Sequence, residues 1–146
     1  GDRVAISEAD EEAMRRSGAA HVRLFGYSGG GAVAALVAAR RSDVAQLVTI
    51  AGTLDHARWT RDDGVSPLSR SLNPADEAIR LQAVPQVHFV GADDETVPPK
   101  VAESYLARMT DRSRSRLVSI PSYDHECCWK QSWRSLLARY VYTATP

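Results

Sequence analysis

The stretch Gly26-Tyr27-Ser28-Gly29-Gly30 places a serine between glycines that stand two residues to either side of it. A serine in this pattern can occupy a sharp turn between a strand and a helix, where its hydroxyl is held clear of the sheet and can act as a nucleophile. The turn requires a strained backbone at the serine, and a side chain at position 26 or 30 would collide with neighbouring backbone. The pattern therefore predicts a nucleophilic serine, and the plain alternative is a glycine-rich connecting turn.

An activated serine needs a histidine that takes its proton and a carboxylate that orients the histidine. Candidates follow two later apolar runs, at residues 86–90 and 117–120: Asp94 comes after the first run and His125 after the second. Because parallel strands end at the same edge of a sheet, side chains that follow them can meet there. The order Ser28, Asp94, His125 thus predicts one Ser-Asp-His site.

A glycine-rich turn at the start of a helix can also bind phosphate, so two nucleotide sites are alternatives. The sequence lacks the Lys-Ser or Lys-Thr pair that completes a P-loop. The glycines around Ser28 also lack the G-x-G-x-x-G order of a dinucleotide site. Both nucleotide interpretations are therefore excluded.

The elements that must position these residues alternate between strand and helix. Strands are predicted at residues 22–25, 44–50, 86–90 and 117–120, and helices at residues 7–18, 32–41, 98–109 and 129–141. Residues 53–80, within a long irregular stretch, are expected to form a small cap or insertion. The alternation predicts an α/β fold in one domain over residues 1–146, with a mostly parallel sheet between two helical layers.

Three separated motifs resemble the C-terminal half of α/β-hydrolase fold proteins: the Gly26 to Gly30 turn, Gly91-x-x-Asp94-x-x-Val97-Pro98, and Asp124-His125-Glu126. The resemblance extends over essentially the whole chain. It implies that Ser28 is the nucleophile, Asp94 the acid and His125 the base. It also implies that the Gly29 N–H is one oxyanion-hole donor and that Tyr27 lies in the same oxyanion and substrate-binding region.

Other residues compete for these roles. Asp93 is the neighbour of the assigned acid, but the spacing to the Val-Pro pair favours the second aspartate of the two. Asp55, beyond the second predicted strand, is a further alternative acid. Asp124 adjoins the histidine, and since adjacent side chains on an extended segment point apart, we expect it to position the loop. Of the other histidines, His88 is predicted in a strand and His56 in a loop.

The resemblance implies a longer sheet, of which only the last four strands can be identified here. The absent part would carry the second oxyanion donor, whose loss typically lowers the rate by about 10²- to 10³-fold, so we expect weak activity from this segment alone. The strand at residues 22–25 would lie inside the family's sheet and here would have one unpaired edge. We therefore expect a fragment of a longer chain, or pairing through the exposed edge near Val22.

Composition excludes other classes of protein. The 18 acidic and 18 basic residues give a formal net charge of zero, which does not favour nucleic acid or an anionic membrane. The basic cluster at residues 112–116 is predicted to be a solvated turn. No stretch approaches the roughly 18 apolar residues that a membrane span needs, and nothing in the composition indicates a compartment.

The two cysteines, Cys127 and Cys128, are adjacent. This spacing disfavours a disulfide between them, and with His125 they would form only a cramped set of metal ligands. We therefore expect two small buried apolar side chains and no metal site. The predicted chemistry needs no cofactor.

The predictions converge on a serine hydrolase, foremost a carboxylic-ester hydrolase that acts on a small-molecule ester or other acyl substrate through an acyl-enzyme. Two alternatives use the same triad, namely acyl transfer to an acceptor other than water and cleavage of a thioester. A third alternative is a truncated, non-catalytic module that retains the fold. The intact order of the three chemical groups argues against that module, and the absent half of the sheet argues for it.

Overall fold

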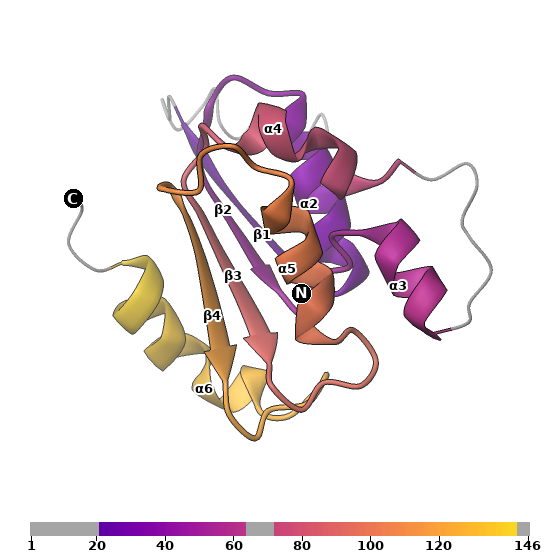
Figure 1. Ribbon diagram of the computed structural model, residues 1–146. Helices are drawn as coiled ribbons and strands as arrows, with labels where there is room; N and C mark the ends of the chain where they lie inside the picture. The colour runs from indigo at the N-terminus through magenta and orange to yellow at the C-terminus, as the bar shows by residue number, and fades with distance from the viewer. Residues whose placement is uncertain (1–20, 64–71, 143–146) are drawn as a thin grey trace.

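The computed structural model describes residues 21–63 and 72–142, and strands and helices alternate along them (Figure 1). The strands are β1 (Val22–Tyr27), β2 (Val44–Ile50), β3 (Gln86–Gly91) and β4 (Ser115–Ile120). The helices are α2 (Gly29–Ala39), α3 (His56–Asp63), α4 (Ala78–Leu81), α5 (Pro99–Ala107) and α6 (Trp129–Leu136). A 3-10 turn, η1 (Pro74–Glu77), precedes α4, and a π-helical turn, η2 (Leu137–Val141), follows α6. The helix predicted at residues 7–18 lies outside the described residues.

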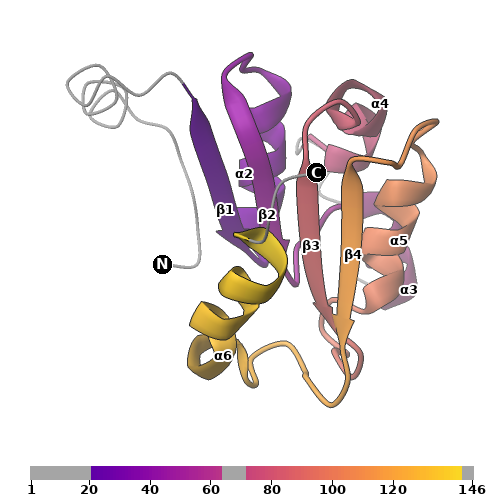
Figure 2. The same ribbon diagram turned by 90° about the vertical axis from the view of Figure 1, so that its left-hand side faces the viewer.

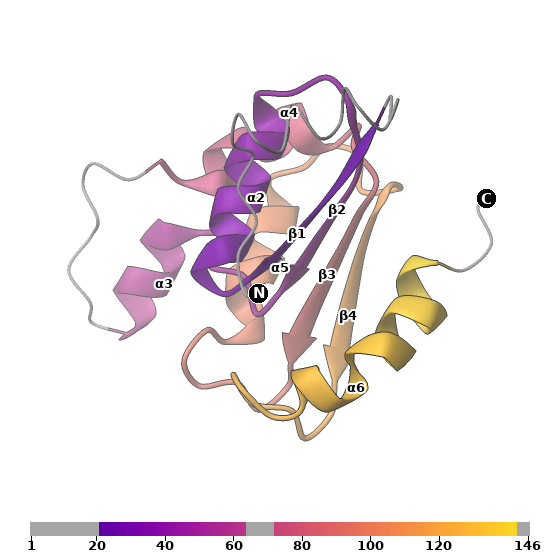
Figure 3. The ribbon, with the colours of Figure 1, turned by 180° about the vertical axis from the view of Figure 1, so that it is seen from behind.

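The strands form one parallel sheet in the order β1-β2-β3-β4. All six residues of β3 are buried, as expected for a strand that is covered on both faces. Figure 2 shows α6 in front of the sheet, and Figures 1 and 3 show α2, α4 and α5 on the opposite face. The α/β fold class, with a parallel sheet between two helical layers, is confirmed.

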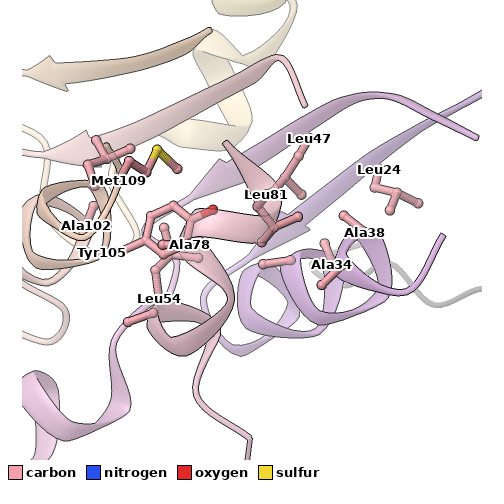
Figure 4. Close-up of a cluster of buried hydrophobic side chains, with 14 of the residues drawn as sticks. Leu24, Ala34, Ala38, Leu47, Leu54, Ala78, Leu81, Ala102, Tyr105 and Met109 are labelled. Carbon is pink, nitrogen blue, oxygen red and sulfur yellow. The ribbon is translucent and has the colours of Figure 1, made fainter. Parts of the chain in front are cut away.

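Each face of the sheet has its own apolar core. The larger one lies beneath α2, α4 and α5, and Figure 4 shows the side chains that these helices contribute together with Leu24 and Leu47 of the strands. The alanines of α2 are buried here, which allows the helix to approach the sheet closely. The predicted apolar face of α5 is also confirmed, because Ala102, Tyr105 and Leu106 are all buried.

The second core lies beneath α6. Val48, Val87 and Phe89 supply the sheet side, and the helical side comes from Trp129, Trp133, Leu136, Leu137, Tyr140 and Val141. This is the stripe that the sequence predicts for the last helix. The prediction of one regular helix to residue 141 is wrong at its end, because the last turn takes the π-helical form of η2.

A buried network of hydrogen bonds is centred on His88 in the larger core. Its Nδ1 lies 2.6 Å from Thr49 Oγ1 and its Nε2 lies 2.8 Å from Gln86 Oε1. The Tyr105 hydroxyl donates to the same Gln86 oxygen at 2.7 Å. Because that oxygen can only accept, Nε2 carries the ring proton and Nδ1 accepts from Thr49. Burial lowers the pKa of His88 to about 3, so the ring is neutral.

Two strands extend beyond their predicted ends because the added residues pair with a neighbouring strand. β1 continues to Tyr27, which pairs with Ile50 of β2. β4 begins at Ser115, which pairs with Gln86 of β3. Arg116 therefore belongs to a strand, and the prediction of a turn over residues 112–116 is wrong at its end.

Candidate active site

Ser28 directly follows β1 and is the N-cap residue of α2. Its φ of 53° and ψ of −122° lie in a region that residues with a side chain rarely adopt. The backbone fixes this turn, because the Ser28 N–H donates to the Ile50 carbonyl at 2.8 Å and the Ser28 carbonyl accepts from the Gly31 N–H at 2.9 Å. The hydroxyl makes no capping hydrogen bond to α2, so it is available to another partner.

Gly26 is required by the space at this turn. A Cβ at position 26 would lie 2.2 Å from the carbonyl oxygen of Gly30, a distance at which the backbone would have to move. The predicted collision at position 26 is confirmed. The other side of the turn is also tight, since a Cβ at Gly31 would lie 3.0 Å from the Cα of Gly52 in the loop after β2.

The structure brings the three predicted residues Ser28, Asp94 and His125 together. His125 Nε2 lies 3.0 Å from Ser28 Oγ, and His125 Nδ1 lies 2.9 Å from Asp94 Oδ2. A carboxylate can only accept, so Nδ1 carries the proton and Nε2 is left to accept from the serine hydroxyl. The Asp94 side chain is 0% exposed and that of His125 is 18% exposed. This arrangement can take a proton from the serine as its oxygen attacks.

Asp94 is held by the turn that carries it. Its Oδ1 accepts from the N–H groups of Thr96 at 2.9 Å and Val97 at 2.7 Å. Both oxygens of this buried carboxylate are therefore used, one by the backbone and one by His125. The turn fixes the direction of the oxygen that faces the imidazole.

The loop that carries His125 is closed by its neighbour Asp124. The Oδ1 of Asp124 accepts from the N–H groups of Glu126 at 2.9 Å and Cys127 at 2.6 Å. The N–H groups of Cys127 and Glu126 lower the pKa of Asp124. The prediction that Asp124 positions the loop is confirmed.

Gly91 allows two loops to meet: the acid turn, residues 91–98, which carries Asp94, and the histidine loop, residues 121–128, which carries His125. A Cβ there would lie 2.5 Å from the Tyr123 carbonyl oxygen and 2.8 Å from that of Asp124. The same Tyr123 oxygen accepts from the Asp93 N–H at 2.9 Å. The backbone of one loop thus lies directly on the other. The glycine three residues before Asp94 is the sequence feature that indicates this close approach.

The two alternative acids, Asp93 and Asp55, lie in different surroundings from Asp94. Asp93 is exposed. Asp55 is 2% exposed and lies just before α3, where its Oδ2 accepts from the Ser104 hydroxyl at 2.5 Å and its Oδ1 from the Asn73 amide at 3.0 Å. Burial raises the pKa of Asp55, but the hydrogen bonds from Ser104 and Asn73 outweigh it and the net pKa is lowered. In the described part of the chain, Asp94 is the carboxylate hydrogen-bonded to the His125 ring.

The other predicted histidines lie elsewhere. His88 lies within β3, as predicted. His56 begins α3, so the prediction of a loop residue is wrong. The reason is that Asp55 and Asn73 start the helix: Asp55 Oδ1 accepts from the Arg58 N–H at 3.2 Å, and Asn73 Oδ1 accepts from the His56 N–H at 2.9 Å.

Tyr27 and Gly29 flank the serine. The Tyr27 hydroxyl donates to the His125 carbonyl oxygen at 2.5 Å, and the two rings are 5.3 Å apart. Gly29 is exposed and is the first residue of α2, so its N–H has no acceptor within the helix. That donor can therefore serve a ligand, while Tyr27 is directed to the histidine loop.

The sequence predicted that Cys127 and Cys128 form no disulfide and that both are buried, and both predictions are wrong. Cys127 and Cys128 are joined by a disulfide, and Cys127 is exposed in the loop between β4 and α6. The loop contributes Tyr123 to the core beneath α6 and leaves Cys127 on the surface. Adjacency in sequence alone did not predict it.

An open pocket of about 430 Å³ adjoins His125. It is lined by Asp93, Glu95, Thr96, Ser122, Asp124, His125 and Glu126. Four of these side chains are carboxylates, so the potential beside the imidazole is negative and repels anions.

Metal and membrane sites have no candidate among the residues described. In residues 21–63 and 72–142, no group of three or more His, Cys, Asp or Glu side chains could hold a metal ion. Over the same residues, no helix combines the length and apolarity that a membrane span requires.

Comparisons with solved structures identify the fold at low sequence identity. A monoacylglycerol lipase from Paleococcus ferrophilus matches with a TM-score of 0.65 and 14% identity, over 91% of this chain and 72% of the lipase. The α/β hydrolase enzyme MGS-MChE2, from the metagenome of lagoon sediments, matches with a TM-score of 0.65 and 22% identity, over 89% of this chain and 65% of that enzyme. An acylaminoacyl peptidase from Pyrococcus horikoshii matches with a TM-score of 0.68 and 14% identity, over 89% of this chain and 24% of the peptidase.

No protein-family model matches the sequence, and no curated protein matches it either. The chain spans less than two thirds of MGS-MChE2 and about a quarter of the peptidase. What it shares with these proteins is a fold, which in this chain is a parallel sheet with helices on both faces. The chain therefore has the α/β-hydrolase fold.

Proposed function

We propose that this chain carries the catalytic triad of a serine hydrolase that cleaves carboxylic esters. The observation that carries the proposal is the continuous set of contacts from Ser28 Oγ to His125 Nε2 at 3.0 Å and from His125 Nδ1 to Asp94 Oδ2 at 2.9 Å. The solved proteins of the same fold include a lipase and an esterase domain. These neighbours support a hydrolase, and the ester as substrate is our proposal.

In the first half of the reaction, Ser28 Oγ attacks the acyl carbon while His125 Nε2 takes its proton. Asp94 keeps the ring in the required tautomer and stabilises the imidazolium that forms. The Gly29 N–H donates to the oxyanion of the tetrahedral intermediate. His125 then protonates the leaving alcohol, which departs and leaves the acyl group on Ser28.

In the second half, His125 Nε2 takes a proton from water, and the water oxygen attacks the acyl carbon. The tetrahedral intermediate collapses, His125 returns the proton to Ser28 Oγ, and the carboxylic acid is released. No metal or cofactor is required by these steps. The acid-lined pocket beside His125 favours neutral over anionic substrates on this proposal.

Product analysis distinguishes the proposed hydrolase from an acyltransferase. The chain is incubated with a p-nitrophenyl ester in the presence and absence of a competing alcohol. A hydrolase releases the free acid even when the alcohol is present, whereas a new ester as the main product would indicate acyl transfer. The Ser28→Ala variant controls for non-enzymatic hydrolysis, and equal acid release by both proteins would contradict the proposal.

Two structural predictions remain proposals. We propose that β1 pairs through its outer edge, because among the described strands it pairs with β2 alone. Size-exclusion chromatography of the chain tests this, and a monomer at all concentrations would contradict pairing of two copies. We also propose that residues 53–80 form a small cap or insertion within one domain. Within this range α3 contacts the turn that carries Asp94, through Trp59 and Thr96, whereas Ala75 and Ala78 are buried in the larger core; residues 64–71 lie outside the described part.

A further inference from the structure

Trp59, in the first turn of α3, makes a contact that the proposed reaction does not use. Its indole N–H donates to the carbonyl oxygen of Thr96 at 2.8 Å. Thr96 belongs to the turn between β3 and α5 that carries Asp94. We infer that Trp59 is a positioning residue that holds this turn, so that Asp94 orients His125. The inference rests on the proposed function.

The contact acts through a single peptide group. The Thr96 carbonyl and the Val97 N–H belong to one planar peptide unit, which moves as a rigid body. Trp59 donates to the oxygen of this unit, and the N–H on its other side donates to Asp94 Oδ1 at 2.7 Å. A hydrogen bond to the carbonyl also polarises the N–H of the same unit and strengthens its bond. Trp59 is thus one peptide group away from the Asp94 carboxylate.

The geometry continues from Asp94 to the reacting oxygen. Asp94 Oδ2 lies 2.9 Å from His125 Nδ1, and His125 Nε2 lies 3.0 Å from Ser28 Oγ. A rotation of the Thr96–Val97 peptide would change the direction of the carboxylate and hence the tilt of the imidazole. Displacement of a catalytic group by about 1 Å can lower a rate by about 10²-fold.

Trp59 is itself anchored to the core of the domain. Its backbone N–H donates to the Asp55 carbonyl at 2.9 Å. The Asp55 side chain is buried and accepts from Ser104 of α5 at 2.5 Å. The start of α3 is therefore tied to α5, and Trp59 reaches the acid turn from this fixed base. An indole held in this way can restrain the turn, which a mobile surface side chain could not do.

The test compares two tryptophan variants of the chain. Trp59→Phe removes the indole N–H and retains an aromatic ring. Trp133→Phe is the matched control, because Trp133 packs against Phe25 and Phe89 in the core beneath α6, on the other face of the sheet. We expect Trp59→Phe to lower kcat and the rate of fluorophosphonate labelling by about 3- to 10-fold, with KM within about twofold of wild type. We expect Trp133→Phe to leave both rates of the folded protein unchanged.

A second readout does not depend on turnover. We expect the proton between His125 Nδ1 and Asp94 Oδ2, which are 2.9 Å apart, to give a low-field resonance in ¹H NMR spectra. We expect Trp59→Phe to move or broaden this resonance and Trp133→Phe to leave it in place. Failure of the wild-type protein to react with the fluorophosphonate would contradict the proposed function. The His125–Asp94 resonance would still test whether Trp59 holds the turn that carries Asp94. Wild-type labelling rates together with an unchanged resonance in Trp59→Phe would overturn the inference alone.

Discussion

The hydroxyl of Tyr27 donates to the backbone carbonyl oxygen of His125 at 2.5 Å, across 98 residues of sequence. Tyr27 is the last residue of β1, and His125 lies in the loop after β4. The residue that precedes the serine thus holds the loop that carries the histidine. The position of Tyr27 near the serine was predicted from the sequence, whereas this contact with His125 is apparent only in the structure.

Tyr27→Phe removes this hydrogen bond and retains the ring. We expect kcat to fall by about 3- to 10-fold because the histidine loop loses one of its restraints, and the free energy of unfolding to fall by about 1 kcal/mol. Tyr105→Phe is the control, since its hydroxyl donates to buried Gln86. It should lower stability without lowering kcat. Ester kinetics and urea unfolding measure both effects, and equal kcat in wild type and Tyr27→Phe would contradict the positioning role.

Gly91→Ala tests the close approach of the two loops. The new Cβ would lie 2.5 Å from the Tyr123 carbonyl oxygen, so the histidine loop must move away from the acid turn. We expect a loss of about 1–3 kcal/mol in stability and a fall in kcat of at least about 10-fold. Gly29→Ala is the control for stability, because its Cβ would meet nothing within 4 Å. Similar unfolding midpoints for the two variants would contradict this account.

Asp94→Asn and Asp55→Asn distinguish the two candidate acids. An amide at position 94 can present its NH₂ group to His125 and favour the wrong tautomer, so we expect kcat to fall by about 10³- to 10⁴-fold. An amide at position 55 disturbs the bonds to Ser104 and Asn73, which should lower stability and change kcat much less. The opposite pattern would assign the role of the acid to Asp55.

Most of the candidate site could be predicted because it depends on local requirements. The turn at Ser28 needs glycine at position 26, and a parallel sheet brings the ends of β1, β3 and β4 to one edge. Both requirements are visible as residue types and spacing. The strands were also predicted from local sequence; β3, for example, was predicted to be buried on both faces, and all six of its residues are buried.

The contacts that were missed join residues far apart in the sequence. The indole of Trp59 reaches Thr96 across 37 residues, and Thr49 reaches His88 across 39. Nothing in the local pattern distinguishes a tryptophan or histidine with such a partner from one that is merely packed. The burial of the cysteine pair was mispredicted, because Cys127 is exposed and Cys128 half-buried, and the burial of a short loop depends on its course over the sheet.

The neutral state of His88 predicts a pH dependence of stability. Its pKa is about 3 in the folded chain, below the ordinary value of 6.5. Between these values the unfolded chain binds a proton that the folded chain does not. The contribution of the neutral His88 ring to the free energy of unfolding is therefore present above pH 6.5 and is lost as the pH falls towards 3. The slope from this one group is at most about 1.4 kcal/mol per pH unit.

Urea unfolding between pH 7 and pH 5 measures this loss, and NMR titration assigns it to the residue. The Cε1–H resonance of His88 should stay constant in the folded chain over this range. A resonance that titrates near pH 6.5 would show that the buried ring is protonated. It would contradict the neutral His88 that is hydrogen-bonded to Thr49 and Gln86.

The most direct test of the central claim is labelling by a fluorophosphonate, followed by mass spectrometry of the peptides. The account predicts one phosphonylated residue, Ser28, in wild-type protein, and labelling that is lost in Ser28→Ala and strongly slowed in a His125 variant. Modification of another residue, or equal labelling of wild type and Ser28→Ala, would contradict the assignment of Ser28 as the nucleophile.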